Sequence, residues 1–440
     1  MNILPYTLET TNDLLTSRAG LLSIAQLMQS IGFPDWVDRY FPAPKSNRGF
    51  PPSTFVNAVM LMLHEGGRCL DDLRHLREDQ ALRTLLGLTQ IPESDSLGDW
   101  LRRHGQQGVA ALTNVNRELL ACSLHHCSRV TLDIDATLSA SKNKQAQWTY
   151  QKCTGYMPMV GHIAETGQVV ATDFRDGNVS PSTNNLAFIH QCEAALPAGV
   201  SLAALRIDAA GYQVAIIDEC IDRQLKFAIR VKMSAALKQQ IRAQAESQWQ
   251  PLVDRQGNDA EAESTTRFIH TMQKSCHSFT VIVQRRQITG QQTLAIDDNE
   301  VQELMQSGQY IYRAIAVSED NTLSDSDWVH WYNQRGEHSE NRIKELKCDF
   351  AADRMPCQDF AANALYFSLC TLAFNLLALM RMHLPPRFES CRAKTIRWRL
   401  YGLAGKIVRH GRKVYLKVSA AHQRLLQEIL WPLQHLAQAP

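Results

Sequence analysis

Apolar residues recur at helical spacing through the first part of the chain. Up to about residue 128 they fall every three or four positions, as in residues 55–63 and again in residues 73–86. No strand pattern interrupts this run. We therefore expect an all-α N-terminal domain over residues 1–128.

The pattern changes to the alternation of strands after residue 128. Residues 130–135 alternate apolar and polar side chains, and residues 162–171 indicate a hairpin that turns near Gly167. A helix over residues 184–195 precedes a second strand, 205–208, which leads through a helix, 213–223, to a third strand, 226–232. This strand, helix, strand order predicts an α/β fold with a mixed or parallel sheet flanked by helices.

Residues 233–330 follow another pattern. A polar helix over 238–249 precedes β-rich segments at 279–283 and 310–317, so we expect a β-rich insertion. Helical spacing returns at Ser339, and the apolar segment 360–380 has the length of a membrane span. It contains four polar residues, so we interpret it as a buried core helix: Asn363, Ser368, Thr371 and Asn375.

The pattern divides the chain into five predicted segments. They are a helical domain (1–128), the first part of a catalytic core (129–232), the insertion (233–330), the second part of the core (331–384) and a basic C-terminal segment (385–440). A chain of 440 residues exceeds the size of one hydrophobic core, which supports several structural units.

Composition adds limits on location and metal binding. The formal charge is only +2, so a surface for nucleic acid needs local clusters of Lys and Arg. Eleven cysteines without a Cys-x-x-Cys pair, and an N-terminus without a signal pattern, predict a reducing, cytoplasmic location. One cluster offers zinc ligands but has no second cluster at zinc-finger spacing: Cys122, His125, His126 and Cys127.

Three carboxylates stand where such folds place function. Asp135 and Asp208 each end a predicted strand, and Ser339 is a candidate cap for a helix that holds Glu340 in its first turn. Carboxylates from separate elements suit Mg²⁺, which prefers oxygen ligands. Two such ions, about 3.5 to 4 Å apart, can clamp a phosphodiester.

The helix after Ser339 is predicted to have two faces. Lys344 and Lys347 follow Glu340 at i+4 and i+7, which places two bases beside the acid. Ile343, Leu346 and Phe350 form an apolar stripe, so one face packs and the other meets an anion.

These motifs resemble the signatures of DDE transposases of bacterial insertion sequences. The matching stretches are Asp135-Ala136-Thr137, Asp208-Ala209-Ala210-Gly211-Tyr212, and Tyr332 through Arg335 and Glu340 to Lys347, together with residues 67–73 and the basic C-terminal segment. The resemblance covers most of the chain.

The resemblance implies a ribonuclease-H-like core and cut-and-paste chemistry on double-stranded DNA. Asp135, Asp208 and Glu340 would be the catalytic residues and would bind Mg²⁺, with Mn²⁺ as a substitute. Tyr332, Arg335 and Lys347 would contact phosphates near the cut. The DNA partners would be the terminal inverted repeats and the target, held by a homodimer in a synaptic complex.

Two positions stay open within this resemblance. Many relatives have three residues between the Arg and the Glu, whereas four stand between Arg335 and Glu340, so Glu337 is an alternative. The six residues before Lys347 favour Glu340. Asp133 points to the same face as Asp135 by strand alternation and is an additional charge near the site, a sheet-edge residue or, less favoured, a direct metal ligand.

Several other segments are candidates for DNA contact. Residues 381–417 hold eleven Lys or Arg and one acid, with a predicted hairpin whose tip carries Arg409, Arg412 and Lys413. A solvated basic tail is the alternative. Residues 94–103 suit the second helix of a helix-turn-helix or an ordinary surface helix. Aromatic residues near the insertion are candidates for holding a flipped base, although tryptophan is more often core: Trp249, Trp328 and Trp331.

Three other functions compete with transposition. A ribonuclease-H-like nuclease without strand transfer would share the triad and the basic surface. An inactive, domesticated DNA-binding protein would keep the fold without the chemistry. A glycosidase needs paired carboxylates but neither metal nor basic segment.

Overall fold

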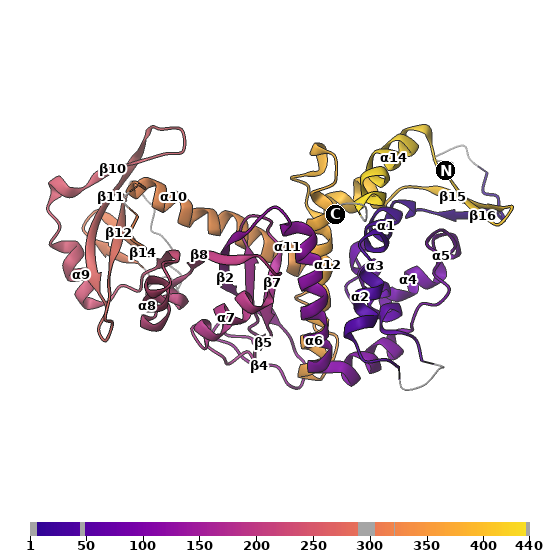
Figure 1. The fold of residues 1–440 in the computed structure, drawn as a ribbon, viewed down its shortest axis with the longest axis horizontal. Helices are drawn as coiled ribbons and strands as arrows, with labels where there is room; N and C mark the ends of the chain where they lie inside the picture. The colour runs from indigo at the N-terminus through magenta and orange to yellow at the C-terminus, as the bar shows by residue number, and fades with distance from the viewer. Residues whose placement is uncertain (1–6, 45–48, 289–303, 321, 437–440) are drawn as a thin grey trace, which may run out of the picture. The chain divides into compact units, whose positions relative to one another are not determined.

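The computed structural model describes residues 7–44, 49–288, 304–320 and 322–436. The chain forms two compact units (Figure 1). The helical unit comprises Met1–Leu119 and Glu345–Pro440, and the sheet unit comprises Leu120–Lys344. The five segment boundaries drawn from the sequence stay predictions.

The sheet unit contains the predicted mixed sheet. Its central strands are β2 (Arg129–Ala136), β8 (Ser201–Ile207) and β9 (Lys226–Arg230), which pair in parallel. β6 (Met159–Ile163) and β7 (Val169–Asp173) continue the sheet beyond β2 as an antiparallel hairpin. The three predicted strands and the hairpin are therefore confirmed.

Helices connect and cover these strands. α7 (Asn185–Ala195) leads into β8, and α8 (Val214–Asp222) connects β8 to β9. Inward side chains of the strands and both helices form one buried core that includes Leu132, Ile134, Phe188, Ile216 and Phe227. The core fixes the strand register, since a slip of one residue would turn every apolar side chain outward.

The turn of the β6–β7 hairpin requires glycine. Gly167 has a φ of +74°, and a Cβ atom there would overlap the guanidinium of Arg342. The start of α11 (Asn341–Asp349) therefore lies beside the hairpin.

The β-rich segment extends the core sheet. β14 (Tyr310–Val317) pairs with β9, and the sheet continues through β12 (Ser278–Gln287) and β11 (Asp259–Thr271) to β10 (Gln250–Val253) (Figure 1). β13 (Met305–Ser307) pairs with β14. The helix predicted over 238–249 is shorter, because α9 covers only Ala235–Arg242. Three short strands form a separate sheet: β3 (Ser139–Ala140), β5 (Thr154–Tyr156) and β4 (Gln147–Trp148).

One helical segment carries the end of the sheet unit. α10 (Asp325–Arg335) continues through a π-helical turn, Gly336–Glu340, into α11. The prediction that Ser339 caps a new helix is wrong, because the backbone stays helical through that residue. The cap lies at Ser324, whose hydroxyl accepts a hydrogen bond from the amide of Asp327 at 3.1 Å.

The helical unit is built on the apolar helix of the sequence analysis. α12 (Phe360–Arg381) is long and apolar enough to cross a membrane, but 94% of its most apolar window is buried inside the protein, as a core helix requires. The predicted stripe of Ile343, Leu346 and Phe350 is also buried.

Smaller helices complete this unit. They are α1 (Leu22–Ser30), α2 (Phe33–Tyr40), α3 (Pro52–Glu65), α4 (Leu73–Glu78), α5 (Gln80–Leu86), α6 (Ser94–Leu124), α13 (Ala393–Ile396) and α14 (Ala420–Gln434). α6 is interrupted at Gly105, whose φ of +37° and ψ of −124° are not helical. It starts at Ser94, so the predicted helix over residues 94–103 forms its first turns.

The N-terminal segment also contains a strand, contrary to the all-α expectation. β1 (Leu14–Thr16) pairs with β15 (Gly405–His410), which forms a hairpin with β16 (Lys413–Lys417). A three-residue strand is too short to show alternation, and its partner lies almost 400 positions away in the sequence. The hairpin itself was predicted; Gly411 and Arg412 at its tip have positive φ, as a two-residue turn requires.

The partly buried Arg397 and the buried His64 join the first and last parts of the helical unit. Arg397 donates hydrogen bonds to the carbonyls of Leu63 and His64 at the end of α3, both at 2.8 Å. Nδ1 of His64 lies 3.0 Å from the hydroxyl of Tyr401. Burial, with the nearby charge of Arg397, lowers the pKa of His64 to about 3, so the native protein holds this imidazole neutral.

Acidification should therefore destabilise the helical unit through His64. The unfolded chain takes up a proton at this residue below its ordinary pKa of 6.5, and the native chain does so only near pH 3. The stability that depends on neutral His64 is complete above pH 6.5 and is lost as the pH falls. Between pH 6 and 4.5, urea unfolding of His64→Gln should show a pH slope smaller than the wild-type slope by about 1.4 kcal/mol per pH unit.

The exposed His410 provides the matched control, because His410→Gln should keep the wild-type slope. Equal slopes for the wild type and His64→Gln would show that His64 is protonated in the folded protein.

Candidate active site

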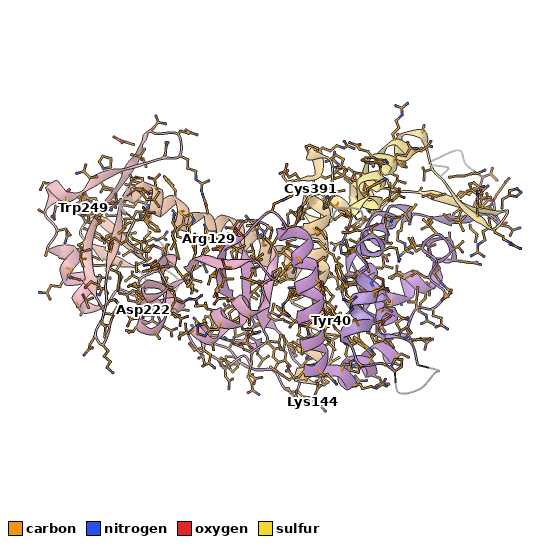
Figure 2. All side chains as sticks on the ribbon, in the orientation of Figure 1. Tyr40, Arg129, Lys144, Asp222, Trp249 and Cys391 are labelled. Carbon is orange, nitrogen blue, oxygen red and sulfur yellow. The ribbon has the colours of Figure 1, made fainter. Side chains whose placement is uncertain are left out.

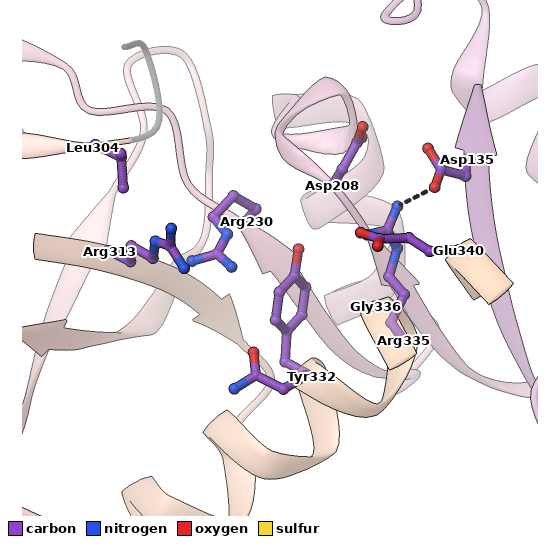
Figure 3. Close-up of a pocket in the computed structure, with 10 residues that line it drawn as sticks. Asp135, Asp208, Arg230, Leu304, Arg313, Tyr332, Arg335, Gly336 and Glu340 are labelled. Atoms are coloured by element: carbon purple, nitrogen blue, oxygen red, sulfur yellow. Dashed lines mark ion pairs between the residues drawn. The ribbon is translucent and has the colours of Figure 1, made fainter. Parts of the chain in front are cut away.

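One pocket of the sheet unit, about 320 Å³ in volume, collects the three carboxylates predicted from the sequence (Figure 3). Its lining consists of Asp135, Asp208, Arg230, Leu304, Arg313, Tyr332, Asn333, Arg335, Gly336 and Glu340. Asp135, Asp208 and Glu340 thus line one pocket, while their catalytic role stays a prediction.

The sheet places the two aspartates. Asp135 is the penultimate residue of β2, and Asp208 directly follows β8. These strands are parallel neighbours, so both side chains lie at the carboxyl ends of the strands. One oxygen of Asp208 accepts a hydrogen bond from the amide of Ala210 at 3.0 Å. This bond fixes the carboxylate at the start of a tight turn.

The π-helical turn places the third carboxylate. Residues five apart in an α-helix stand about 140° apart around the axis. A π turn closes its hydrogen bonds from i to i+5, which brings such residues onto one side. The turn over Gly336–Glu340 therefore directs Arg335 and Glu340 into the same pocket.

Arg335 supplies positive charge among the acids. Its Nη2 lies 3.3 Å from Oδ2 of Asp135 and donates a hydrogen bond to the carbonyl of Ile134 at 3.1 Å. Figure 3 shows the three carboxylates around this guanidinium. Burial opposes the charge of Arg335, but the surrounding acids, Asp135 first, raise its pKa, so it stays protonated.

The environment of Asp135 disfavours its charged form. Burial raises the pKa of Asp135 to about 6, and repulsion from Asp208 and Glu340 acts in the same direction, while Arg335 acts against it. A bound cation would relieve this repulsion, because it attracts all three carboxylates.

The chemical type of the three carboxylates, though not their spacing in this structure, fits a divalent metal. Three carboxylates offer the hard oxygen ligands that Mg²⁺ and Mn²⁺ prefer. Among the residues that the structure describes, no three His, Cys, Asp or Glu side chains stand close enough together to enclose an ion. In this arrangement the compensating charge at the pocket comes from Arg335. The same finding covers the cysteine and histidine cluster at residues 122–127.

The other predicted contact residues divide between the pocket and the surface. Tyr332 lies in the pocket with Arg335, whereas Lys344 and Lys347 follow on α11 and are not part of its lining. The basic tip with Arg409, Arg412 and Lys413 is exposed and belongs to the helical unit. The side chain of Glu337, the alternative to Glu340, lies outside the described residues.

Asp133 has a partner of its own. Both of its oxygens accept hydrogen bonds from Arg206 at 2.7 Å, and each side chain of the pair is only 2% exposed. Arg206 also donates to the carbonyl of Trp331 at 2.6 Å. β2 is a central strand, so the interpretation of Asp133 as a sheet-edge residue is wrong. The pair ties the sheet to α10.

The tryptophans take different positions. Trp328 is 1% exposed and belongs to the core between α10 and the sheet. Trp331 lies against Arg206, whose Cζ is 5.2 Å from its ring. Trp249, labelled in Figure 2, stacks on Arg285, whose Cζ is 4.2 Å from its ring.

Sequence reasoning missed three arginines near the site. Arg206 and Arg230 lie on the strands that carry or adjoin Asp208, and Arg230 ends its strand just as the two aspartates do. The strand-end rule would have found Arg230. Nothing in the pattern around Arg313 separates it from an ordinary surface residue of a strand.

A mixed α/β sheet whose edge combines three carboxylates with several arginines defines a phosphoryl-transfer type of site. The chain belongs to the family described as Transposase DDE domain group 1, whose model matches residues 6–438. It is therefore a DDE transposase, an enzyme that acts on DNA, and such domains use divalent metal ions.

Among solved structures, the chain is similar to a piggyBac transposase, determined by cryo-electron microscopy as a synaptic complex with hairpin DNA. The identity is 10% and the TM-score 0.45, and the similarity covers 87% of this chain and 79% of that one. No curated protein matches the chain.

The buried pair of Asp133 and Arg206 should prove structural. Asp133→Asn leaves a buried guanidinium without its counter-charge, which should lower the free energy of unfolding by about 3 to 5 kcal/mol. Metal-dependent DNA cleavage should persist at temperatures where the variant is folded. Chemical denaturation and a cleavage assay measure the two effects.

The half-buried pair of Glu193 and Arg223 is the control, and Glu193→Gln should cost no more than about 1 kcal/mol. Loss of cleavage by a fully stable Asp133→Asn protein would instead place Asp133 among the metal ligands.

Proposed function

We propose that this transposase cuts DNA at the ends of a bacterial insertion sequence and joins the freed 3′-hydroxyl to target DNA. Asp135, Asp208 and Glu340 are the proposed catalytic triad. The observation that carries the proposal is their position: three separate elements bring them to one pocket, together with Arg335 and Tyr332.

The sheet order supports a ribonuclease-H-like core. β7, β6, β2, β8 and β9 follow one another across the sheet, with the last three parallel and the first two antiparallel. The two aspartates end the adjacent strands β2 and β8, which is where such a core would need its first two ligands.

The π turn favours Glu340 over Glu337. With three residues between the Arg and the Glu, an ordinary α-helix places both on one side. Here four residues intervene, and the π turn accommodates the additional one without moving Glu340 away from Arg335.

We assign the metal as Mg²⁺, with Mn²⁺ as a substitute, held by Asp135, Asp208 and Glu340. When bound, two such ions activate the attacking oxygen and stabilise the leaving oxygen of the phosphodiester. Arg335 keeps Asp135 oriented through their ion pair. The guanidinium of Arg335 and the hydroxyl of Tyr332 are placed to donate hydrogen bonds to a phosphate in the pocket.

We also propose how the rest of the chain serves this reaction. The N-terminal helices would read the terminal repeats, the β15–β16 tip would bind backbone phosphates, and a homodimer would hold both ends. The exposed bases at the tip, Arg409, Arg412 and Lys413, support the second assignment. Lys344 is likewise exposed on α11 and is assigned to phosphate contact, with Lys347. The enzyme would act in the bacterial cytoplasm.

Removal of any triad carboxylate should abolish chemistry and spare binding. Asp135→Asn, Asp208→Asn and Glu340→Gln keep side-chain size but remove ligand charge. Each should lower Mg²⁺-dependent cleavage by at least about 1000-fold, since loss of one electrostatic group at a reacting centre has effects of this order. Affinity for end DNA, measured without divalent metal, should stay within a few-fold.

Glu337→Gln tests the register. It should cleave like the wild type, and the reverse result, with Glu340→Gln active, would move the third ligand to residue 337. If cleavage occurs but joined products never form, the enzyme is a nuclease without strand transfer.

The β15–β16 tip should contribute to the salt dependence of DNA binding. Arg409→Ala, Arg412→Ala and Lys413→Ala should each reduce the slope of log affinity against log salt concentration by about 0.9, because each lost phosphate contact releases one fewer counterion. Titrations of duplex DNA at several salt concentrations give the slope.

Arg424→Ala on α14, also exposed and in the same unit, is the matched control and should keep the wild-type slope. A triple tip variant with the wild-type slope would exclude the tip from the DNA interface.

A further inference from the structure

Two arginines outside the triad face the same pocket. Arg230 is the last residue of β9 and Arg313 lies on β14, and both line the pocket of the carboxylates. They also line a smaller adjoining hollow with Tyr332 and Asn333. In Figure 3 their guanidinium groups lie close together, with Tyr332 between them and the carboxylates.

The sheet register brings these side chains together. Arg230 pairs with Ile315, and Arg313 precedes Ile315 by two residues, so both arginines project from the same face of the sheet. Such diagonal neighbours stand about 7 to 8 Å apart at the backbone, within reach of one common anion for two long side chains. Ile315 is buried in the core below α10, which fixes the pair at the edge of that core.

Arg230 and Arg313 have no acidic partner among the described residues, unlike the arginines of the nearby strands β11 and β12. On the adjacent strands Arg267, Arg285 and Arg286 form ion pairs with Asp325, Glu246 and Glu263. Within the described ranges, no carboxylate or hydrogen-bond acceptor pairs with Arg230 or Arg313. The Cζ of Arg230 lies 4.9 Å from the ring of Tyr332, a contact that orients the guanidinium without neutralising it.

We propose that Arg230 and Arg313 form a second phosphate site, which holds a DNA backbone phosphate flanking the one cut at the carboxylates. The inference rests on the proposed function. Two guanidinium groups side by side repel each other until an anion lies between them, and each offers paired N–H donors that match phosphate oxygens. The carboxylates repel a phosphate that has no bound metal. The carboxylate half and the arginine half of the pocket therefore suit different phosphates of the DNA strand.

This arrangement has a consequence for the cut. A strand held at one phosphate can slide or rotate, whereas a strand held at a neighbouring phosphate presents a single phosphodiester to the triad. The arginine pair is thus a positioning element, because backbone contacts fix register.

Phosphate interference tests the proposal. End DNA with a single neutral methylphosphonate at successive positions is titrated with the protein in the absence of divalent metal. For the wild type, one flanking position should weaken binding about tenfold, the loss expected for charge-assisted hydrogen bonds. Arg230→Gln/Arg313→Gln should lose sensitivity at that position and keep it elsewhere, with a salt slope reduced by up to about 1.8.

Two further variants make the result decisive. Arg313→Gln alters only an exposed side chain, so it should fold and should show part of the loss. Arg286→Gln, which removes one charge from β12, should keep the full wild-type interference pattern. If the double variant keeps every sensitivity and the full salt slope, the pair is not a phosphate site.

This experiment measures binding alone. The interference pattern can contradict the arginine site while the triad variants still abolish cleavage. It can equally support the arginine site when the triad variants keep cleavage. The two proposals are therefore tested separately.

Discussion

Repulsion among the carboxylates of Asp135, Asp208 and Glu340 is the constraint on which the site depends. Three acids at one sheet edge need positive charge in a partly buried position. Arg335 supplies it and comes from the same helical segment as Glu340, five residues earlier. The π turn between them directs both Glu340 and the positive charge of Arg335 into the pocket.

The position of α10 in turn depends on the sheet. Trp328, Val329 and Tyr332 pack on the face formed by β9, β12 and β14, while Arg206 holds the carbonyl of Trp331 from the central strands. If β14 did not pair with β9, this face would end at β9 and α10 would lose much of its support. The strands expected as an insertion therefore help to align α10 and the turn that carries Glu340, and the core sheet and its extension act as one layer.

Local sequence patterns predicted much of this fold. They could not predict the pairing of strands that lie far apart in the sequence. The strands ending at Asp135 and Asp208 were predicted because each has alternation and a turn signal within a few residues. β1 was missed because its partner lies at the other end of the sequence. The sequence predicts a cap at Ser339 where the structure has a π turn over Gly336–Glu340. A π turn bonds residue i to i+5 and an α-helix bonds i to i+4, and no residue type specifies this difference.

The sequence pointed to the pocket residues that are carboxylates at strand ends and missed the arginines of the same pocket. Carboxylates beside a tight turn stand out, but Arg313 resembles any polar residue on a strand until pairing places it beside Arg230. The finished pocket has the acids, with Arg335 among them, on the β2 and β8 side, and Arg230 and Arg313 on the β9 and β14 side. A net charge of +2 conceals this arrangement. Under the two proposals, DNA bound to the acidic half through metal would need the basic half as well, because only a second point of attachment determines which of its identical phosphates reaches the metal.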